Sequence, residues 1–315
     1  METWSVESIE LQLGKMALIT SGVRGTGLEV ARVLADKGAK VIICGASEEE
    51  GNAALADLNA NRSGALVSFE KVDFADFQSV TELADKINDK EIKIDLLINN
   101  AEISNLKERM ESAQGHELMF SYNYLSHFLL TAKLFSGLES RKGARIVFQC
   151  SHEYSRGALD FFDLDGEQFY EAKKAYLQSK LALLIFAREL DRRLRATLID
   201  IRSIPVHAGE PHSSFVVKFL NLAFGQSVKQ TALPILFAAT ANQAISGHFY
   251  APHGLFELWG HPVEIDFDLE AKNIHAAERL WEISQEVTGI EFNMQDLTNV
   301  IPFYPKGGPR PELFT

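Results

Sequence analysis

The chain has few of the features that mark secreted or membrane-spanning proteins. Only two of its 315 residues are cysteines, Cys44 and Cys150, and each ends an apolar run. We interpret them as buried, reduced thiols rather than a disulfide, which is typical of a reducing compartment. The N-terminus shows no apolar signal-peptide core, and no apolar run approaches about 18 residues. We therefore expect a cytoplasmic chain without a transmembrane segment.

Basic charge is scarce as well. The 31 lysines and arginines are outnumbered by 43 acidic residues, which gives a formal net charge of −12. An acidic surface repels phosphate backbones, so we expect no nucleic acid among the partners. The nine histidines contain no H-x-x-x-H pair within an expected helix, and we predict no metal site.

What the chain does contain is a regular alternation of short apolar runs and longer segments of helical period. Parallel strands covered on both faces produce this pattern. We predict an α/β fold: a doubly wound parallel sheet (Rossmann fold) forming a single domain over residues 1–300, with helices on both faces. Residues 301–315 are expected to form an extended C-terminal tail or to be disordered. Strands are expected at 16–20, 41–44, 66–72, 96–98, 145–149, 197–203 and 248–250, and helices at 28–37, 48–59, 80–87, 112–138, 172–194 and 228–241.

A glycine-rich turn joins the first expected strand to the first expected helix. Small residues allow a tight turn, and the N-terminus of a helix offers backbone N–H groups and a positive dipole to a phosphate. A plain glycine-rich turn is the alternative. The candidate phosphate-binding residues are Thr20, Ser21, Gly22, Arg24, Gly25, Thr26 and Gly27.

A second motif, Y-L-Q-S-K, places Tyr176 and Lys180 four residues apart in an expected helix. This spacing puts both side chains on one face. An ammonium near a phenol stabilises the phenolate and makes the phenol a usable acid or base. On its own the pair could equally be a solvated helix face.

Further motifs occur in a fixed order around this pair: Asp73 in VDFAD, N-N-A at 99–101, Asn123 in FSYNYLSHFLLT and Ser151 in IVFQCS. With them, residues 13–289 resemble the short-chain dehydrogenase/reductase family, nearest its retinol-dehydrogenase-like branch. The resemblance implies an oxidoreductase acting on an alcohol or carbonyl group (class EC 1.1.1.-). It implies the catalytic residues Asn123, Ser151, Tyr176 and Lys180.

The resemblance also assigns roles to these residues. Tyr176 exchanges a proton with the substrate oxygen, which Ser151 holds by a hydrogen bond. Lys180 binds the nicotinamide ribose, and Asn123 positions a water that links it to solvent. The cofactor supplies the hydride. Further cofactor contacts are implied for Asp73, Asn100, Ala101 and Pro205.

The end of the second expected strand favours NADP(H) over NAD(H). An acidic residue there would bind a ribose 2′-hydroxyl and repel a 2′-phosphate. Residues 44–47 read C-G-A-S, so Ser47 stands there without an acid. Arg24 is similar to a basic residue of NADP-dependent members and could pair with the 2′-phosphate. A solvated loop charge is the alternative for Arg24.

Four residues depart from the family pattern: Ser21, Glu102, Val206 and Glu210. Glu102 replaces the last residue of N-N-A-G, where a carboxylate could disfavour a phosphate-rich ligand. We therefore keep two alternatives. The first is non-redox acid/base chemistry, as in an isomerase or cyclase, with Glu102 or His152 as a second proton-transfer group. The second is a non-catalytic protein that binds a partner.

The resemblance further implies a substrate lid over about 205–227. The lid is apolar, which favours a lipophilic ketone, aldehyde or alcohol as substrate. Its aromatic candidates, together with two in the preceding loop, could instead be core or dimer contacts. A homodimer or homotetramer is a family expectation, although the tail could keep the chain monomeric. The candidate residues are Phe161, Phe162, Phe215, Phe219 and Phe224.

Overall fold

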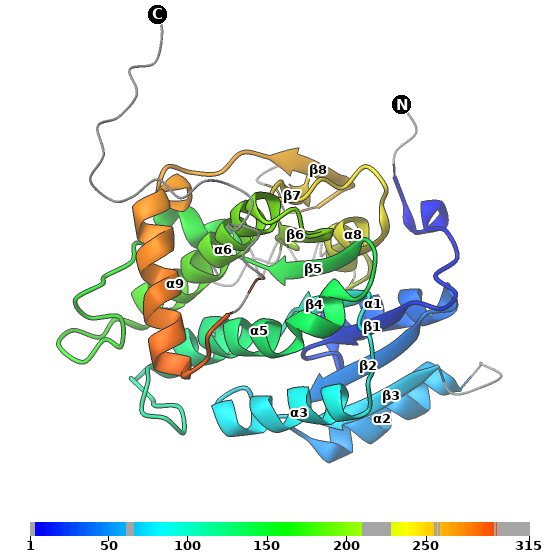
Figure 1. Cartoon of the computed structure of the whole chain (residues 1–315), viewed down its shortest axis with the longest axis horizontal. Coiled ribbons are helices and arrows are strands. Elements are labelled where there is room, and N and C mark those ends of the chain that lie inside the picture. Colours follow the sequence, from blue (N-terminus) through cyan, green and yellow to red (C-terminus); the bar gives the residue numbers. More distant parts are fainter. Residues whose placement is uncertain are drawn as a thin grey trace, which may run out of the picture.

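The structure is a computed structural model that describes residues 4–60, 66–209, 228–254, 257, 259–292 and 294. Within these residues, eight strands form one sheet in the order β3-β2-β1-β4-β5-β6-β7-β8 (Figure 1). All neighbouring strands run parallel except β7 and β8, which are antiparallel. The predicted doubly wound α/β fold is confirmed.

The strands and helices alternate along the chain as predicted. The strands are β1 Met16–Ile19, β2 Lys40–Gly45, β3 Val67–Lys71, β4 Leu96–Asn99, β5 Ala144–Gln149, β6 Ile201–Val206, β7 Phe249–Pro252 and β8 Pro262–Ile265. The helices are α1 Gly25–Asp36, α2 Glu48–Asn59, α3 Phe77–Asp89, α4 Leu118–Phe120, α5 Ser126–Glu139, α6 Ala172–Ala196, α8 Val228–Thr240 and α9 Ile274–Thr288. A π-helical turn, η2 (Ser121–Leu125), joins α4 to α5, and a 3₁₀ turn, η3 (His152–Arg156), follows β5.

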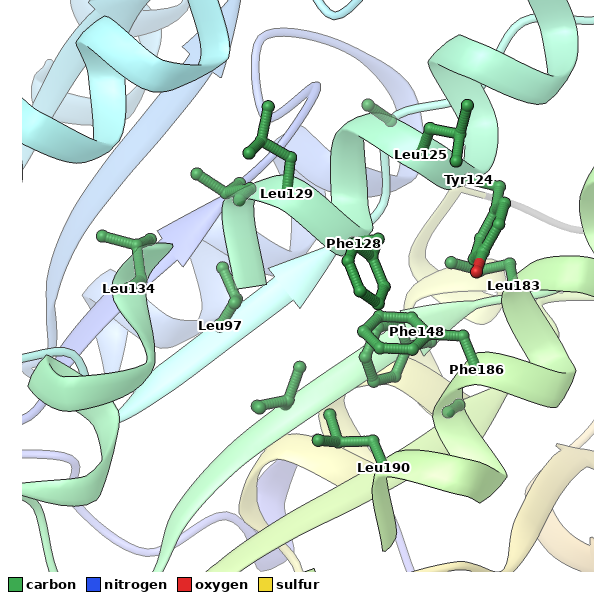
Figure 2. Packing of buried hydrophobic residues seen from close by; sticks show 14 of the residues in the cluster. Leu97, Tyr124, Leu125, Phe128, Leu129, Leu134, Phe148, Leu183, Phe186 and Leu190 are labelled. Carbon is green, nitrogen blue, oxygen red and sulfur yellow. The ribbon is translucent and has the colours of Figure 1, made fainter. Parts of the chain in front are cut away.

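The sheet is buried on both faces by two separate apolar cores. One core packs α3, α5, α6 and α9 on one face, with aromatic rings such as Phe128, Phe148 and Phe186 at its centre (Figure 2). The other packs α1, α2 and α8 on the opposite face. Cys44 and Cys150 are both buried free thiols, as expected. Burial raises the pKa of Cys150 to about 12, so this thiol is unreactive.

The strand order also locates the ligand crevice. β1 lies between β2 and β4, so the chain winds outward in both directions from this point. In open α/β sheets, ligands bind at the carboxyl ends of the strands where the winding reverses. The residues that follow β1, β4, β5 and β6 therefore meet at one edge of the sheet.

Two boundaries differ from the predictions for a clear structural reason, and one strand was missed. The sixth strand begins at Ile201 rather than at 197, because α6 continues to Ala196 and Thr197 caps it by donating its hydroxyl to Arg193 O. Residues 112–117 are a turn closed by a Ser112 N–H bond to His116 O, not the start of a helix. Strand β8, on the antiparallel edge, was not predicted. Among the described residues, no helix is both long and apolar enough to cross a membrane.

Candidate active site

The turn between β1 and α1 has the shape of a phosphate-binding loop. Its first helical hydrogen bond runs from Leu28 N–H to Arg24 O, so the N–H groups of residues 25–27 lie outside the helical ladder. Arg24 is the N-cap residue, and its side chain has no acceptor with which to cap them. A Cβ on Gly27 would overlap the carbonyl oxygen of Ser21. Ser21 has φ 52°, a left-handed conformation that suits the glycine expected there.

Thr20 ties this turn to the end of β4. Its buried hydroxyl oxygen accepts hydrogen bonds from the N–H groups of Asn100 and Ala101, both at 2.8 Å. The Asn100 side chain donates in return to the Thr20 carbonyl at 3.0 Å. These bonds therefore hold the end of β1, at Thr20, against the end of β4, at Asn100 and Ala101.

The three residues predicted to contact the adenosine half lie at the outer side of this turn. Arg24 is exposed and forms a 3.4 Å ion pair with Glu50. The Ser47 hydroxyl caps α2 by accepting the Glu50 N–H. The Asp73 carboxylate accepts the Ala75 N–H at 2.8 Å. Each is bonded locally, and a contact of each with the cofactor stays a prediction.

The predicted catalytic residues converge after β5 and in the first half of α6. Tyr176 hydrogen-bonds to the Ser151 hydroxyl, and Ser151 also accepts the Glu153 N–H. Lys180 is fully buried and donates to the Gln149 carbonyl of β5 at 2.7 Å. The i, i+4 spacing thus brings phenol, ammonium and serine hydroxyl together, as the sequence predicted.

Glu102 joins this group in a way that the sequence did not specify. Its carboxylate accepts the Tyr176 hydroxyl at 3.1 Å and pairs with the Lys180 ammonium at 2.6 Å. Burial raises the pKa of Tyr176, and the Glu102 charge raises it further, while the Ser151 bond lowers it in part. In this arrangement Tyr176 is a neutral phenol and a proton donor, not a base.

Asn123 supports the segment that carries Glu102. Its side chain accepts the Ile103 N–H at 2.8 Å and donates to the Ile103 carbonyl at 3.0 Å and to the Ser179 hydroxyl at 2.9 Å. Asn123 lies in the π-helical turn η2, a feature frequent at functional sites. Asn123 thus links the residue after Glu102 to Ser179 of α6, and its role in positioning a water beside Lys180 stays a prediction.

The comparisons with known proteins agree with this geometry. The sequence model of the family described as short chain dehydrogenase matches residues 15–208. The chain belongs to the short-chain dehydrogenase/reductase family. It is 33% identical over 289 residues to retinol dehydrogenase 12 of Bos taurus, covering 89% of this chain and 88% of the relative.

Other relatives place this short-chain dehydrogenase in the retinol-dehydrogenase-like branch. It is 34% identical over 244 residues to polyprenol dehydrogenase of Danio rerio, covering 76% of this chain and 74% of that protein. The crystal structure of an uncharacterized protein from Mycobacterium paratuberculosis matches with a TM-score of 0.80 and 28% identity, covering 93% of this chain and all of the other. Family membership assigns the chain a general dehydrogenase/reductase role.

A dehydrogenase of this family requires a nicotinamide cofactor. The glycine turn, at one end of the crevice, fits such a cofactor better than the Tyr176–Lys180 end does. The glycine turn fits a dinucleotide phosphate, because side chains are excluded where its backbone must approach the ligand. At the other end, the groups expected to hold the nicotinamide ribose are already bonded to Glu102. Within the described residues, no group of three or more metal-ligating side chains occurs.

A cavity of about 310 Å³ lies beside Tyr176 in this short-chain dehydrogenase. Apolar groups of Leu106 and Ala172 and charged groups of Lys107 and Glu153 line it. Phe161 and Phe162 do not line it; both rings contact the Arg279 guanidinium, and Phe162 is 89% exposed. Phe161 packs against the apolar core, and a contact of either ring with substrate stays a prediction. Pro205 is buried in β6, whereas Glu210, Phe215, Phe219, Phe224 and the tail at 301–315 lie outside the described residues.

A histidine pair beside Ser151 was partly missed by the sequence analysis. His207, buried at the end of β6, bonds through Nε2 to Glu257 at 2.7 Å, and its ring centroid lies 5.9 Å from that of His152. Because the Gly209 N–H donates to Nδ1 of His207, the Nε2 atom carries the proton. Burial lowers the pKa of His152, which favours the neutral form of that ring. The sequence could have indicated His207 as a site residue, because it directly follows the strand β6, and residues at that position face the ligand crevice.

Proposed function

We propose that this chain is an NADP(H)-dependent oxidoreductase that interconverts a lipophilic ketone or aldehyde and the corresponding alcohol. The observation that carries the proposal is the convergence of Ser151, Tyr176 and Lys180 beside the glycine turn. A nicotinamide cofactor, when bound, supplies or accepts the hydride. The chain's own residues bind the substrate oxygen and move its proton.

Tyr176 is the proton donor in the direction of reduction. Burial and the Glu102 charge raise the pKa of Tyr176, so the phenol is protonated near neutral pH but is a weaker acid than a free tyrosine. It can give its proton to the oxygen of a reacting carbonyl when the phenolate that forms is stabilised. Ser151 can hold that same oxygen, because its hydroxyl already reaches the Tyr176 hydroxyl. Lys180, fixed by Gln149 O, places a positive charge next to the phenol and stabilises the phenolate that remains.

The choice of a lipophilic substrate rests on the relatives and on the cavity. The names of two relatives point to retinol and polyprenol, which are long apolar alcohols. The cavity beside Tyr176 has apolar walls at Leu106 and Ala172, although Lys107 and Lys173 also line it. We infer that an apolar carbonyl compound enters with its oxygen toward Tyr176.

Titration of NADPH and NADH by fluorescence, followed by turnover of retinal, tests the proposal. We expect NADPH to bind more tightly than NADH and retinal to be reduced. Tyr176→Phe should lower kcat by roughly 100-fold or more, the usual contribution of a general acid. Tyr170→Phe, which removes a phenol outside this group, should retain activity. Full turnover by Tyr176→Phe would overturn the mechanism.

The contact of Glu102 with Tyr176 favours one second candidate, non-redox acid/base chemistry such as isomerisation or cyclisation. A carboxylate and a phenol that share a hydrogen bond can pass a proton between them. This candidate requires that neither NADPH nor NADH binds while Tyr176→Phe still abolishes a reaction. Cofactor binding with turnover decides for the oxidoreductase.

A further inference from the structure

Glu102 occupies an unusual place for a carboxylate. It follows the run N-N-A at the end of β4, and its side chain is only 16% exposed. One oxygen pairs with Lys180 and the other accepts the Tyr176 hydroxyl. Both groups that the proposed mechanism assigns to cofactor and substrate are therefore held by one side chain of the chain itself.

We propose that Glu102 is an internal competitor of the cofactor, which closes the Tyr176–Lys180 pair and must leave it before NADP(H) can bind productively. This inference rests on the proposed function. The carboxylate offers two adjacent oxygens to an ammonium and a hydroxyl, as the vicinal diol of a ribose does. The Lys180 ammonium and the Tyr176 hydroxyl cannot bond fully to the Glu102 carboxylate and to a ribose at the same time.

The donors cannot move away to make room. The Lys180 ammonium is fully buried and is fixed from the other side by the Gln149 carbonyl of β5. Tyr176 lies less than one and a half helical turns away on the same rigid helix and is bonded to Ser151. An incoming ligand must therefore displace the carboxylate rather than the ammonium or the phenol.

The backbone on both sides of Glu102 is also fixed. The N–H of Ala101 is bonded to Thr20, and both backbone groups of Ile103 are bonded to the Asn123 side chain. Only the Glu102 side chain is left to rotate. Opening is thus a local change of rotamer that leaves the strand end, the glycine turn and the helix in place.

Competition of this kind weakens the measured affinity in a defined way. When only a fraction of the protein is open, the apparent Kd equals the intrinsic Kd divided by that fraction. A ligand that stops short of Lys180 is not affected. Adenosine 2′,5′-bisphosphate carries the adenosine half of NADP(H) without the nicotinamide ribose, so it separates the two ends of the crevice.

The test compares NADPH and adenosine 2′,5′-bisphosphate binding by calorimetry to the wild type, Glu102→Gln, Glu102→Gly and Glu108→Gln. Glu108→Gln removes the same charge from an exposed position in the same loop. We expect NADPH affinity to rise several-fold in Glu102→Gln and about tenfold or more in Glu102→Gly. The bisphosphate should bind all four proteins alike, and Glu108→Gln should match the wild type.

A second readout uses NADH. Glu102→Gln and Glu102→Gly should also bind NADH more tightly than the wild type does, because NADH carries the same nicotinamide ribose. NADPH affinity that is equal in all four proteins, or that rises equally in Glu108→Gln, would overturn the competition alone. Failure of every variant to bind NADPH or NADH would overturn the proposed function as well.

Discussion

At the glycine turn, the backbone groups of residues 25–27 lie outside the helical ladder and small residues keep side chains out of the way. At the Tyr176–Lys180 end, every polar group described above is bonded to another side chain or to the backbone. The first region is built to receive a ligand without rearrangement, whereas the second must first break a contact.

This difference separates affinity from activity. We expect the glycine turn to bind the phosphate-bearing half of a dinucleotide in the structure as it stands. We expect the Tyr176–Lys180 end to decide whether that binding leads to chemistry, because Glu102 contacts both groups. The segment from Asn100 to Ile103 joins the two regions, and bonds to Thr20 and Asn123 fix its two ends. A substitution in one region can therefore be tested for its effect on ligand binding in the other.

The largest effect is expected from Lys180→Met. Retinal reduction should fall by roughly 100-fold or more, because phenolate stabilisation is lost. The variant also leaves the Glu102 charge without its partner, which costs about 3 kcal/mol of unfolding free energy for a pair this deep. Urea unfolding measures the second effect. Lys180→Met with Glu102→Gln should regain stability without activity; if stability does not return, the pair is not the cause.

Gly27→Ala should affect the other region. The new Cβ would overlap Ser21 O and lie 2.7 Å from the Asn100 side chain, so the turn must distort. We expect about 1–3 kcal/mol of destabilisation and weaker binding of NADPH and of adenosine 2′,5′-bisphosphate alike. Gly137→Ala, a buried helical glycine with room for a Cβ, is the control and should stabilise α5 by up to about 1 kcal/mol. Loss of NADPH binding alone would contradict this separation.

His127 lies between the two regions and makes stability depend on pH. Its ring bonds to the Thr20 hydroxyl and to Asn123 O, and burial lowers the pKa of His127 to about 4 from 6.5. Its contribution is complete above pH 6.5 and is lost as the pH falls toward 4, because only the unfolded chain takes up the proton. The loss should reach about 2 kcal/mol at pH 5. Urea unfolding at pH 7 and pH 5 should show a smaller change in His127→Gln; an equal change would remove His127 as the cause.

The smallest effect is expected from Arg24→Gln. Arg24 is exposed and its pair with Glu50 is long, so unfolding free energy should change by less than about 0.5 kcal/mol. NADPH affinity should nevertheless fall several-fold while NADH affinity stays constant, because only NADPH carries the 2′-phosphate. Competitive titration of the two cofactors gives this ratio. Equal losses for both would show that Arg24 does not read the 2′-phosphate.

Periodicity was enough to predict the wound sheet, since apolar runs such as 41–44 and 145–149 are buried on both faces and need no partner information. Strand β8 is different. Its four residues, P-V-E-I, pair antiparallel with β7 at the sheet edge, and only Pro262 among them is buried. Such a strand forms because it pairs with β7, and its own four residues show no pattern that predicts a strand.

The site shows the same division. From the sequence we predicted that Tyr176, Lys180 and Ser151 lie together, and the structure places them so. Their catalytic roles, and that of Asn123, stay predictions. The sequence also marked Glu102 as a departure. Which atoms its carboxylate reaches depends on the path of residues 101–103, and that path is set by bonds to Thr20 and Asn123 from distant parts of the chain. No local pattern encodes such bonds.

The π-helical turn at Ser121–Leu125 has a consequence for how this protein can change. Such a turn holds one residue more than an α-helical turn. Deleting one residue there would restore a regular α-helix and remove the wider turn that holds Asn123. Asn123 would then no longer meet the backbone of Ile103. This helix should therefore accept many replacements of its side chains but no insertion or deletion.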